Sequence, residues 1–371
     1  MTGANKGPRR PDAGRHEGSI MKNVFDITEY GAVGDGAADC TAAIQRALDD
    51  AAAVNGTVIV PPGRFCTGEL RMGKHTRLEG GSAWSFRTDG VSTLVLNDPE
   101  ARFLIDITGA FGCTISGVCL DGRELGRCIH GVYLRWERYN GGDEEDTPTI
   151  DDCRIGRFSG DGLHYERVWC FSVRHSMIHG NAGSGLYIDG WDAFIMDNWF
   201  TFNKKSGIRG GPITASVTAT GNRVEWNGES GIYFHEGDSI NITGNFFDRT
   251  FGPALRLSGG FFRDCAVTGN VFRRSGCPDG MNFESEYENS HVYLDNVSNV
   301  TLTGNTFRWG ENDGGGGTKS PDYDIYLANS DASVIQGNVM KEGSLKDSIV
   351  YDGRGDIIIK DNIASPAKTD R

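Results

Sequence analysis

The chain has 371 residues, with 50 acidic and 37 basic side chains and a formal net charge of −13. This charge argues against a nucleic acid partner, because phosphate binding needs a basic face. No run of eighteen apolar residues is present, so we expect no segment that spans a membrane. Glycine is abundant at 53 residues and proline is scarce at 11, which favours many tight turns between short strands.

The first residues, 1–23, are polar and charged and carry no apolar stretch of the kind that a secretory signal needs. We expect a disordered leader and a cytoplasmic protein. The nine cysteines show no Cys-x-x-Cys spacing, and several lie in apolar runs. Buried free thiols are therefore expected, rather than a disulfide framework or a zinc site.

A single amphipathic helix is predicted after Asp39, which can cap its N-terminus. Its apolar positions Ile44, Ala47, Leu48 and Ala51 follow the helical i, i+3, i+4, i+7 rule. A strand at 57–60 follows and ends at the Pro61-Pro62-Gly63 turn. We interpret residues 24–72 as an N-terminal cap and first coil, and 24–371 as one domain.

From residue 198 onward an asparagine recurs at intervals of 23 to 35 residues. A repeat of this length, with asparagine at a corner between short alternating strands, is typical of a solenoid. The asparagines are expected to stack as a hydrogen-bonded ladder of structural importance. The repeating positions are Asn198, Asn222, Asn245, Asn270, Asn305, Asn338 and Asn362.

The opening of the chain resembles the pectate-lyase superfamily. The resemblance is carried by residues 25–36, by Asp39 and Thr41, and by the stretches 60–65 and 67–70. It implies an all-β, right-handed, single-stranded parallel β-helix with an N-terminal capping helix, the fold of polygalacturonases and of phage tailspike-like glycan depolymerases. By analogy with such β-helices the protein could form a homotrimer. The resemblance supports the fold far more than the activity.

One strand of each coil alternates between inward and outward side chains, and its inward position is aliphatic. The inward positions are Val132, Leu163, Leu186, Ile208, Ile232, Leu255, Val292, Ile325 and Ile349. The first outward column comprises Tyr133, His164, Tyr187, Arg209, Tyr233, Arg256, Tyr293, Tyr326 and Val350. The second outward column comprises Arg135, Glu166, Asp189, Gly211, His235, Ser258, Asp295, Ala328 and Asp352.

Tyrosine and arginine beside a column of carboxylates favour a carbohydrate groove. Aromatic rings stack on sugar faces, and arginine binds hydroxyls or carboxylates. The alternative is that tyrosine is simply a good outward strand residue. The residues predicted to bind substrate are Tyr187, Arg209, Tyr233, His235, Arg256, Trp191, His164 and Tyr293. Three inserted loops, 137–149, 276–289 and 310–323, would wall the groove or make a subunit contact.

Four acids are candidates for catalysis. Glu166 and Asp189 occupy one column on adjacent coils, which places their carboxyl groups about 5 Å apart, near the spacing of a retaining glycosidase pair. Glu236 lies two coils from Asp189, roughly 10 Å away, which suits an inverting pair. Asp192, near the following turn, is the fourth candidate. We expect Asp189 to act as nucleophile or base and Glu166 or Glu236 as the acid.

Residues 189–192 faintly resemble the Asn-Thr-Asp-Gly element of polygalacturonases, but the other elements of that family are missing. A lyase is an alternative, in which Arg209 or Arg256 acts as base near Asp189 and Glu236 and a Ca²⁺ ion assists.

Our prediction is an enzyme that cleaves or rearranges glycosidic bonds of an oligo- or polysaccharide, without cofactor or metal. Inulin-fructotransferase-like chemistry belongs with this hypothesis by analogy. The alternatives are a metal-assisted polysaccharide lyase and a non-catalytic, glycan-binding or tailspike-like scaffold.

Overall fold

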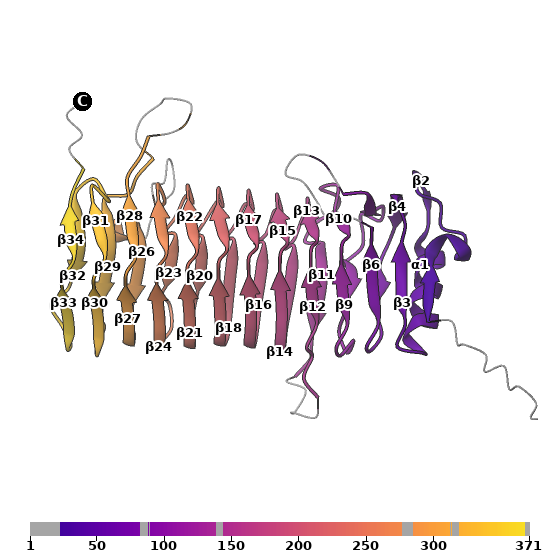
Figure 1. Cartoon of the computed structure of the whole chain (residues 1–371), viewed down its shortest axis with the longest axis horizontal. Coiled ribbons are helices and arrows are strands. Elements are labelled where there is room, and N and C mark those ends of the chain that lie inside the picture. The colour runs from indigo at the N-terminus through magenta and orange to yellow at the C-terminus, as the bar shows by residue number, and fades with distance from the viewer. Residues whose placement is uncertain are drawn as a thin grey trace, which may run out of the picture.

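A computed structural model describes residues 23–81, 88, 90–138, 144–276, 285–311, 313 and 319–367. The predicted leader lies outside these ranges except for its last residue. The described chain forms a solenoid of parallel strands stacked along one long axis (Figure 1). The strands belong to a 21-stranded and a 13-stranded parallel sheet. The prediction of an all-β parallel β-helix is therefore confirmed.

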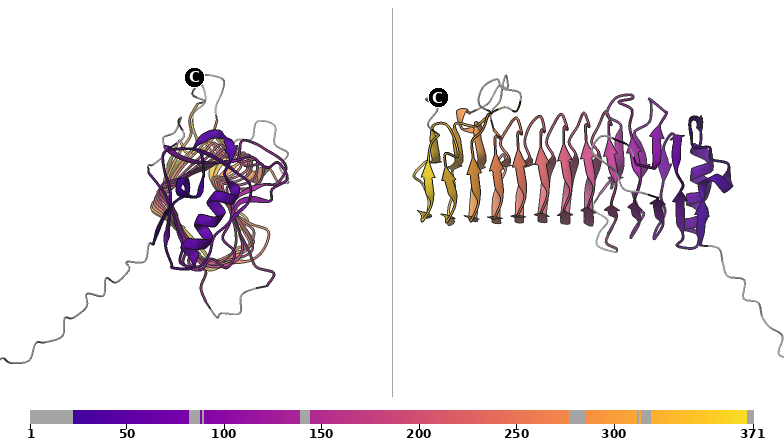
Figure 2. Two further views of the ribbon diagram at one scale, coloured as in Figure 1. Left: turned by 90° about the vertical axis from the view of Figure 1, so that its right-hand side faces the viewer. Right: turned by 45° about the horizontal axis from the view of Figure 1, so that its top comes forward.

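The N-terminal end of the solenoid is covered by the helix α1, Thr41–Ala52 (Figure 2). Its residues Ile44, Ala47, Leu48 and Ala51 are buried, as the periodicity predicts. The N-cap position belongs to Cys40, one residue later than expected, but the Asp39 carboxylate accepts the Thr41 amide at 3.0 Å. Two 3-10 turns, Ile27–Tyr30 and Glu286–Glu288, are the other helical segments in the described ranges.

Each coil contributes strands to three faces. The face that follows the predicted columns, here called the site face, contains β5 (Leu70–Arg71), β8 (Phe103–Asp106), β11 (His130–Arg135), the first halves of β14 (Leu163–Arg174), β16 (Leu186–Met196) and β18 (Ile208–Thr220), and β20 (Ile232–Phe234), β23 (Leu255–Leu257), β26 (Ser290–Asp295), β29 (Tyr323–Ala328) and β32 (Asp347–Tyr351).

The second face continues from the site face, since β14, β16 and β18 run through both. It contains β1 (Val24–Asp26), β3 (Thr57–Val60), β6 (Arg77–Gly80), β9 (Thr114–Ser116), β12 (Thr149–Asp151), the second halves of the three long strands, β21 (Gly237–Thr243), β24 (Phe262–Thr268), β27 (Val297–Thr303), β30 (Ser333–Gln336) and β33 (Ile357–Lys360).

The third face is the 13-stranded sheet. It contains β2 (Asp35–Asp39), β4 (Gly63–Thr67), β7 (Ser92–Leu96), β10 (Cys119–Asp121), β13 (Arg154–Gly156), β15 (Met177–His179), β17 (Trp199–Thr201), β19 (Arg223–Glu225), β22 (Phe246–Asp248), β25 (Val271–Arg273), β28 (Thr306–Arg308), β31 (Val339–Lys341) and β34 (Ile363–Ser365).

The core consists of the inward side chains of the three faces, stacked coil upon coil. On the site face the inward residues pair strand to strand from Val132 to Ile349 in the predicted order. All are fully buried except Ile349, which is half-buried. On the third face the rings of Phe247, Phe272 and Phe307 stack with centroids 5.0 and 4.9 Å apart.

The corner asparagines form the predicted ladder. Each side-chain amide from Asn198 to Asn338 donates to the Oδ1 atom of the next asparagine at 2.9–3.1 Å. It also donates to a main-chain carbonyl of the preceding coil. A second, shorter ladder, which the repeat did not indicate, joins Asn181, Asn203 and Asn227 at the corner after the third face. Both ladders satisfy buried turn backbone and hold the coils in register.

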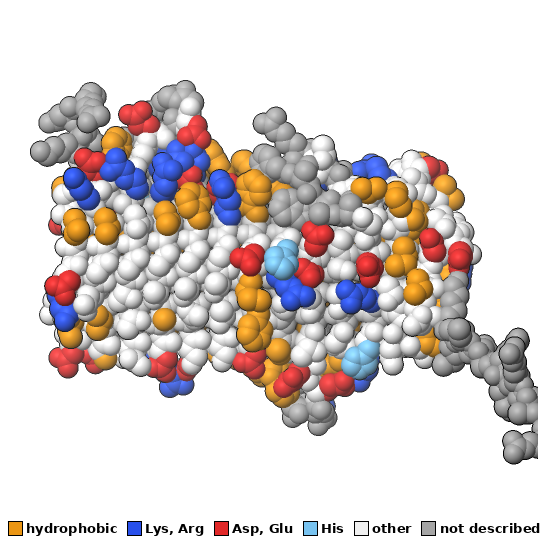
Figure 3. Space-filling view, viewed as in Figure 1, with side chains coloured by type: hydrophobic (Ala, Val, Ile, Leu, Met, Phe, Trp, Pro, Cys, Tyr) orange, Lys and Arg blue, Asp and Glu red, His pale blue; other side chains and the backbone are white. Residues whose placement is uncertain are grey.

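Over β21, β24 and β27 the middle of the second face carries few charged or apolar side chains (Figure 3), whereas Asp238, Arg263 and Asp264 lie near the beginning of β21 and β24. Its outward positions include Thr218, Thr243, Thr268 and Thr303. The outward positions of these three strands therefore offer a sugar no aromatic ring.

All eight cysteines within the described ranges are free thiols, and six of them are buried. Cys128 is exposed and Cys170 is half-buried, while Cys277 lies outside the described residues. No helix in the described part is long and apolar enough to cross a membrane. Residues 139–143, 277–284, 312 and 314–318 of the three predicted loops also lie outside the described residues.

Candidate functional site

The first outward column of the site face has the predicted register from Tyr133 to Val350. Its side chains stack on one another. The His164 ring lies 5.6 Å from Tyr133 and 4.8 Å from Tyr187, nearly parallel to both. Further along, the Arg209 and Arg256 guanidinium groups lie 4.7 and 4.8 Å from the Tyr233 ring. The column is a continuous aromatic and cationic ladder along the solenoid axis.

Several members of this ladder are already engaged within the protein. Arg209 forms an ion pair with Glu229 at 3.0 Å, and Arg256 forms one with Glu288 at 3.0 Å. Tyr293 is only 7% exposed, and burial raises its pKa to about 12. Tyr133, Tyr187, Tyr233 and Tyr326 are half-buried. Among these tyrosines, Tyr187 and Tyr233 lie on the coils nearest to Asp189.

The second column is confirmed only in part. Arg135, Glu166 and Asp189 occupy successive coils in register. The prediction that Gly211 continues this row is wrong. Between Ile188 and Gly190 the β16 strand advances two positions, whereas its partner β18 advances four, from Gly210 to Thr214.

The two extra residues in β18 make Pro212 and Ile213 protrude, and both are exposed. Gly211 then lies against the Tyr187 hydroxyl and Asp189, where an added Cβ would be 2.6 and 3.1 Å from them. A side chain at position 211 would crowd both groups. The bulge therefore places a bare backbone and the Ile213 amide beside Asp189.

Glu166 is held by two cationic or polar donors. One carboxylate oxygen lies 2.9 Å from Arg135 Nε, and the other lies 3.0 Å from His164 Nε2. The opposite ring nitrogen of His164, Nδ1, lies 2.7 Å from the Asp161 carboxylate. Burial acts to lower the pKa of His164, but Asp161 and Glu166 outweigh it and raise that pKa above its usual range. Arg135 and His164 thus fix the position of the Glu166 carboxylate from two sides.

Asp189 lies in a different environment, although its Cα is paired with that of Glu166. It is 8% exposed, and its Oδ1 accepts the Ile213 amide at 3.1 Å. Burial raises the pKa of Asp189 above its usual range, and the charge of Glu166 adds to this effect. The Ile213 hydrogen bond and Arg167 oppose the rise. The two carboxyl groups, on neighbouring strands, thus have different environments: Asp189 is buried against the Ile213 amide, whereas Glu166 is paired with Arg135 and His164.

The other predicted acids lie apart from this pair. Asp192 has a left-handed φ of 61° and accepts the Trp169 indole N–H at 3.0 Å, so it links two coils on the second face. Trp191 pairs with Trp169 there, beyond the strand segment that carries Asp189. His235 and Glu236 are exposed and follow the end of β20.

Two hollows flank the Glu166–Asp189 pair along the axis. One, of about 340 Å³, is lined by Ile213 and Glu236, among others, and adjoins Asp189 through the Ile213 amide. The other, of about 610 Å³, includes Arg135 in its lining and thereby adjoins Glu166. Its walls are Lys74, Thr108, Phe111, Arg135, Trp136, Glu137, Arg138 and Glu144. The carboxyl pair therefore lies between two recesses along the edge of the site face.

Phe111 and Trp136 form the aromatic wall of the larger hollow, with ring centroids 5.9 Å apart. The Trp136 indole N–H donates to Asp146 at 2.9 Å, and Lys74 lies 4.4 Å from the Phe111 ring. These residues come from separate coils, and the repeat pattern contains no signal that joins them. Trp136, which directly follows Arg135 and begins an inserted loop, is the one that sequence reasoning could have found.

A column of charged and polar side chains also runs in register along the third face, from His179 through Glu225 and Asp248 to Arg308. The alternating charges of this column in the sequence predict a solvated or subunit-facing surface, and this prediction is wrong at the centre of the column. Glu225 and Asp248 are 3% and 2% exposed. Glu225 accepts the Trp199 indole N–H at 3.0 Å, and Asp248 accepts Arg274 Nε at 2.8 Å. These acids stabilise the wall of the solenoid.

Sequence comparison agrees with this architecture. The family model described as "Right handed beta helix region" matches residues 105–277 and 161–316, which together cover more than half of the chain. A second model, "Rhamnogalacturonase A/epimerase, pectate lyase-like", matches residues 24–95. The chain therefore belongs to the right-handed β-helix proteins of the pectate-lyase-like superfamily.

Among curated relatives, mannuronan C5-epimerase AlgE3 of Azotobacter vinelandii is 26% identical over 261 residues, 66% of this chain and 14% of that protein. Mannuronan C5-epimerase AlgE5 of the same organism is 24% identical over 274 residues, 66% of this chain and 25% of that protein. The chain spans at most a quarter of the length of these two relatives.

Similar solved structures include a DFA-IIIase from Arthrobacter chlorophenolicus, with a TM-score of 0.64, 14% identity and coverage of 94% of this chain and 99% of the other. The A-module of mannuronan C-5 epimerase AlgE4 from Azotobacter vinelandii has a TM-score of 0.55, 18% identity and coverage of 92% and 100%. The Streptococcus pneumoniae surface adhesin PfbA has a TM-score of 0.54, 15% identity and coverage of 93% of each chain. At these identities the likeness establishes the fold alone.

Proposed function

We propose that this chain is a polysaccharide-acting enzyme whose reaction centre is the Glu166–Asp189 pair on the site face. The observation that carries the proposal is the contrast within the pair. Asp189 is buried with a raised pKa, whereas Glu166, on the adjacent strand, is held by Arg135 and His164. A buried carboxyl group that holds its proton more tightly than usual, with a second carboxyl group a strand spacing of about 4.8 Å away, suits cleavage of a glycosidic bond.

In this reaction Asp189 donates a proton to the leaving glycosidic oxygen, and the Glu166 carboxylate attacks or stabilises the anomeric carbon. The roles are the reverse of those expected from the sequence, because the pKa of Asp189 is the one that rises. Water then attacks the anomeric carbon and releases the sugar from Glu166, and the Asp189 carboxylate accepts a proton from that water, which restores the acid. A spacing near 5 Å leaves no room for an intervening water and favours retention of anomeric configuration.

The polysaccharide would lie along the solenoid axis, with the pair between the two hollows. Tyr187 and Tyr233 would support sugar rings from the site face, and the Phe111–Trp136 wall would hold the sugar beyond Glu166. Gly211 lets the β18 backbone approach Tyr187 and Asp189 closely, because an added Cβ would crowd both groups. Glu236, in the smaller hollow, is available to bind sugar hydroxyls rather than to complete the pair.

A second candidate is C5 chemistry on a uronate polymer, either epimerisation or elimination. It is favoured by the match to mannuronan C5-epimerases over two thirds of this chain. Such a reaction needs a cation to neutralise the uronate carboxylate and a group that exchanges the C5 proton. Arg167 lies close enough to Asp189 to lower that acid's pKa, and the Tyr187 hydroxyl lies near Gly211. In this second candidate, Arg167 as the cation and the Tyr187 hydroxyl as the proton-exchanging group would carry the reaction in place of the carboxyl pair.

The test is incubation of the purified chain with a panel of fructans, glucans and uronans in D₂O, followed by proton NMR. New reducing ends without unsaturation support the glycosidase. Deuterium incorporated at C5 of a uronate supports epimerisation, and an unsaturated product absorbing in the near ultraviolet supports elimination. Binding of a glycan without any of these products would contradict an enzymatic function and favour a scaffold.

A further inference from the structure

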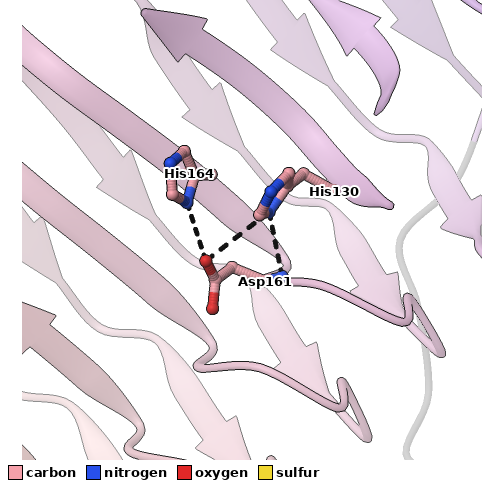
Figure 4. A group of neighbouring side chains, drawn as sticks. All are labelled: His130, Asp161 and His164. Atoms are coloured by element: carbon pink, nitrogen blue, oxygen red, sulfur yellow. Dashed lines mark hydrogen bonds and ion pairs between the residues drawn. The ribbon is translucent and has the colours of Figure 1, made fainter. Parts of the chain in front are cut away.

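Three side chains that could bind a metal ion converge beside the candidate reaction centre: His130, Asp161 and His164 (Figure 4). His130 begins β11, Asp161 lies in the turn before β14, and His164 lies within β14. One potential ligand atom from each residue lies within 4.8 Å of the others. Within the described residues this is the one group of three or more such side chains. No metal ligand is expected from the sequence alone.

The distances between the potential ligand atoms are close to those around a bound ion. The Asp161 carboxylate oxygen Oδ2 lies 2.7 Å from His164 Nδ1 and 3.5 Å from His130 Nδ1. Metal–ligand bonds of 2.0–2.2 Å place neighbouring ligand atoms about 3.0–3.5 Å apart. The His130 separation fits without adjustment, and the His164 separation has to open by a few tenths of an ångström.

The remaining polar atoms of the cluster have partners that would orient the ligands. His164 Nε2 bonds to the Glu166 carboxylate at 3.0 Å, and Asp161 Oδ1 accepts the Ser184 amide at 2.6 Å. A histidine ligand whose other ring nitrogen donates to a carboxylate is the usual arrangement in metal sites. The Asp161 amide lies 3.1 Å from His130 Nδ1, so an ion bound through that atom replaces one hydrogen bond.

The donor set indicates the class of ion. Ca²⁺ takes oxygen ligands, and two imidazoles do not suit it. Two histidines and one carboxylate suit Zn²⁺ and the neighbouring first-row divalent ions. The three side chains are 13–16% exposed, so an ion has access from solvent and keeps room for water or a sugar hydroxyl as a further ligand.

We propose that His130, Asp161 and His164 form a binding site for one divalent first-row transition-metal ion, next to Glu166. This proposal does not rest on the proposed glycosidase or epimerase activity, because it is tested by metal binding alone.

The test is isothermal titration of Zn²⁺ into the tag-free, chelator-treated full chain. We expect about one equivalent to bind, and binding at least tenfold weaker in His130→Ala and in Asp161→Asn. The matched control is His175→Ala. This exposed histidine also bonds an aspartate, Asp151, at 2.9 Å, but lies outside the cluster. Circular dichroism establishes that each variant is folded.

Absence of stoichiometric Zn²⁺ binding would overturn the proposal, as would unchanged affinity in a folded His130→Ala variant. A second measurement needs no variant. The wild-type chain loaded with one equivalent of Cu²⁺ is studied by pulsed electron paramagnetic resonance, which counts coordinated imidazoles by their remote nitrogens. Two imidazoles support the site, and none or one contradicts it.

Discussion

Replacement of Asn222 by alanine tests the corner ladder within its buried part. Residue Asn222 is 1% exposed, and its side chain takes part in four hydrogen bonds. Its amide donates to the Ile195 carbonyl and to Asn245 Oδ1, both at 2.9 Å. Its oxygen accepts the Asn198 main-chain N–H at 3.0 Å and the Asn198 side-chain amide at 3.1 Å. Alanine removes all four without removing the main-chain bonds of residue 222 itself.

The expected cost follows from these four bonds. Each contributes about 1 kcal/mol net, so Asn222→Ala should lower the free energy of unfolding by about 4 kcal/mol. Water cannot replace the lost partners, because the neighbouring asparagines are as buried as Asn222. The matched control is Asn362→Ala at the open end of the ladder, where the side chain is half-buried and makes three such bonds. Water can take their place there, so we expect a cost of about 1 kcal/mol.

The assay is urea unfolding followed by far-ultraviolet circular dichroism. Because a solenoid can unfold coil by coil, amide hydrogen exchange should accompany the titration and show whether the loss centres on the coils that contain residues 198–245. If Asn222→Ala costs no more than Asn362→Ala, the ladder does not stabilise the coils in the way described.

Three further predictions concern the core, the reaction centre and the larger hollow. The Tyr165 hydroxyl is fully buried and has no hydrogen-bond partner in the described part of the chain. Tyr165→Phe should therefore raise the free energy of unfolding by about 1 kcal/mol. A lower thermal midpoint of the variant would contradict this. Because burial raises the pKa of Asp189, the folded state binds its proton more tightly than the unfolded state does. The contribution of the Asp189 carboxyl group to stability is present at low pH and is lost as the pH rises through the raised pKa. In thermal unfolding scans Asp189→Asn should therefore gain stability relative to wild type towards neutral pH. Equal unfolding midpoints of the two proteins at all pH values would refute this. Phe111→Leu should raise KM about three- to tenfold with little change in kcat, and an unchanged KM would remove the aromatic wall from the substrate path.

The repeat predicted the register of the solenoid well because its cause is local. The corner asparagine and the alternation of apolar residues recur in each coil, and a shift by one residue would expose an entire aliphatic row. For this reason the pairing of Glu166 with Asp189 could be read from the sequence. The Asn181 ladder was missed because it spans only three coils and is continued by Thr250 and Ser275 instead of asparagine.

The details of the site were less predictable because they depend on departures from the repeat. The two extra residues in β18 shift Gly211 out of its row and bring the Ile213 amide to Asp189. No periodic pattern indicates on which side of a strand such an insertion protrudes. The roles of the acids also depend on burial and partners, which column positions do not specify. His164, expected to bind sugar, has both ring nitrogens engaged by Asp161 and Glu166.

The most direct test of the central claim is the rate of glycan turnover in three variants, once the panel has identified a substrate. Asp189→Asn and Glu166→Gln should each lower kcat by a factor of about 10² to 10⁴, the usual effect of removing a catalytic acid or base. Asp295→Asn, an aspartate of the same predicted column that bonds Asn329 at 2.8 Å, should retain wild-type turnover. Full turnover by the folded Glu166→Gln/Asp189→Asn double variant would contradict the account.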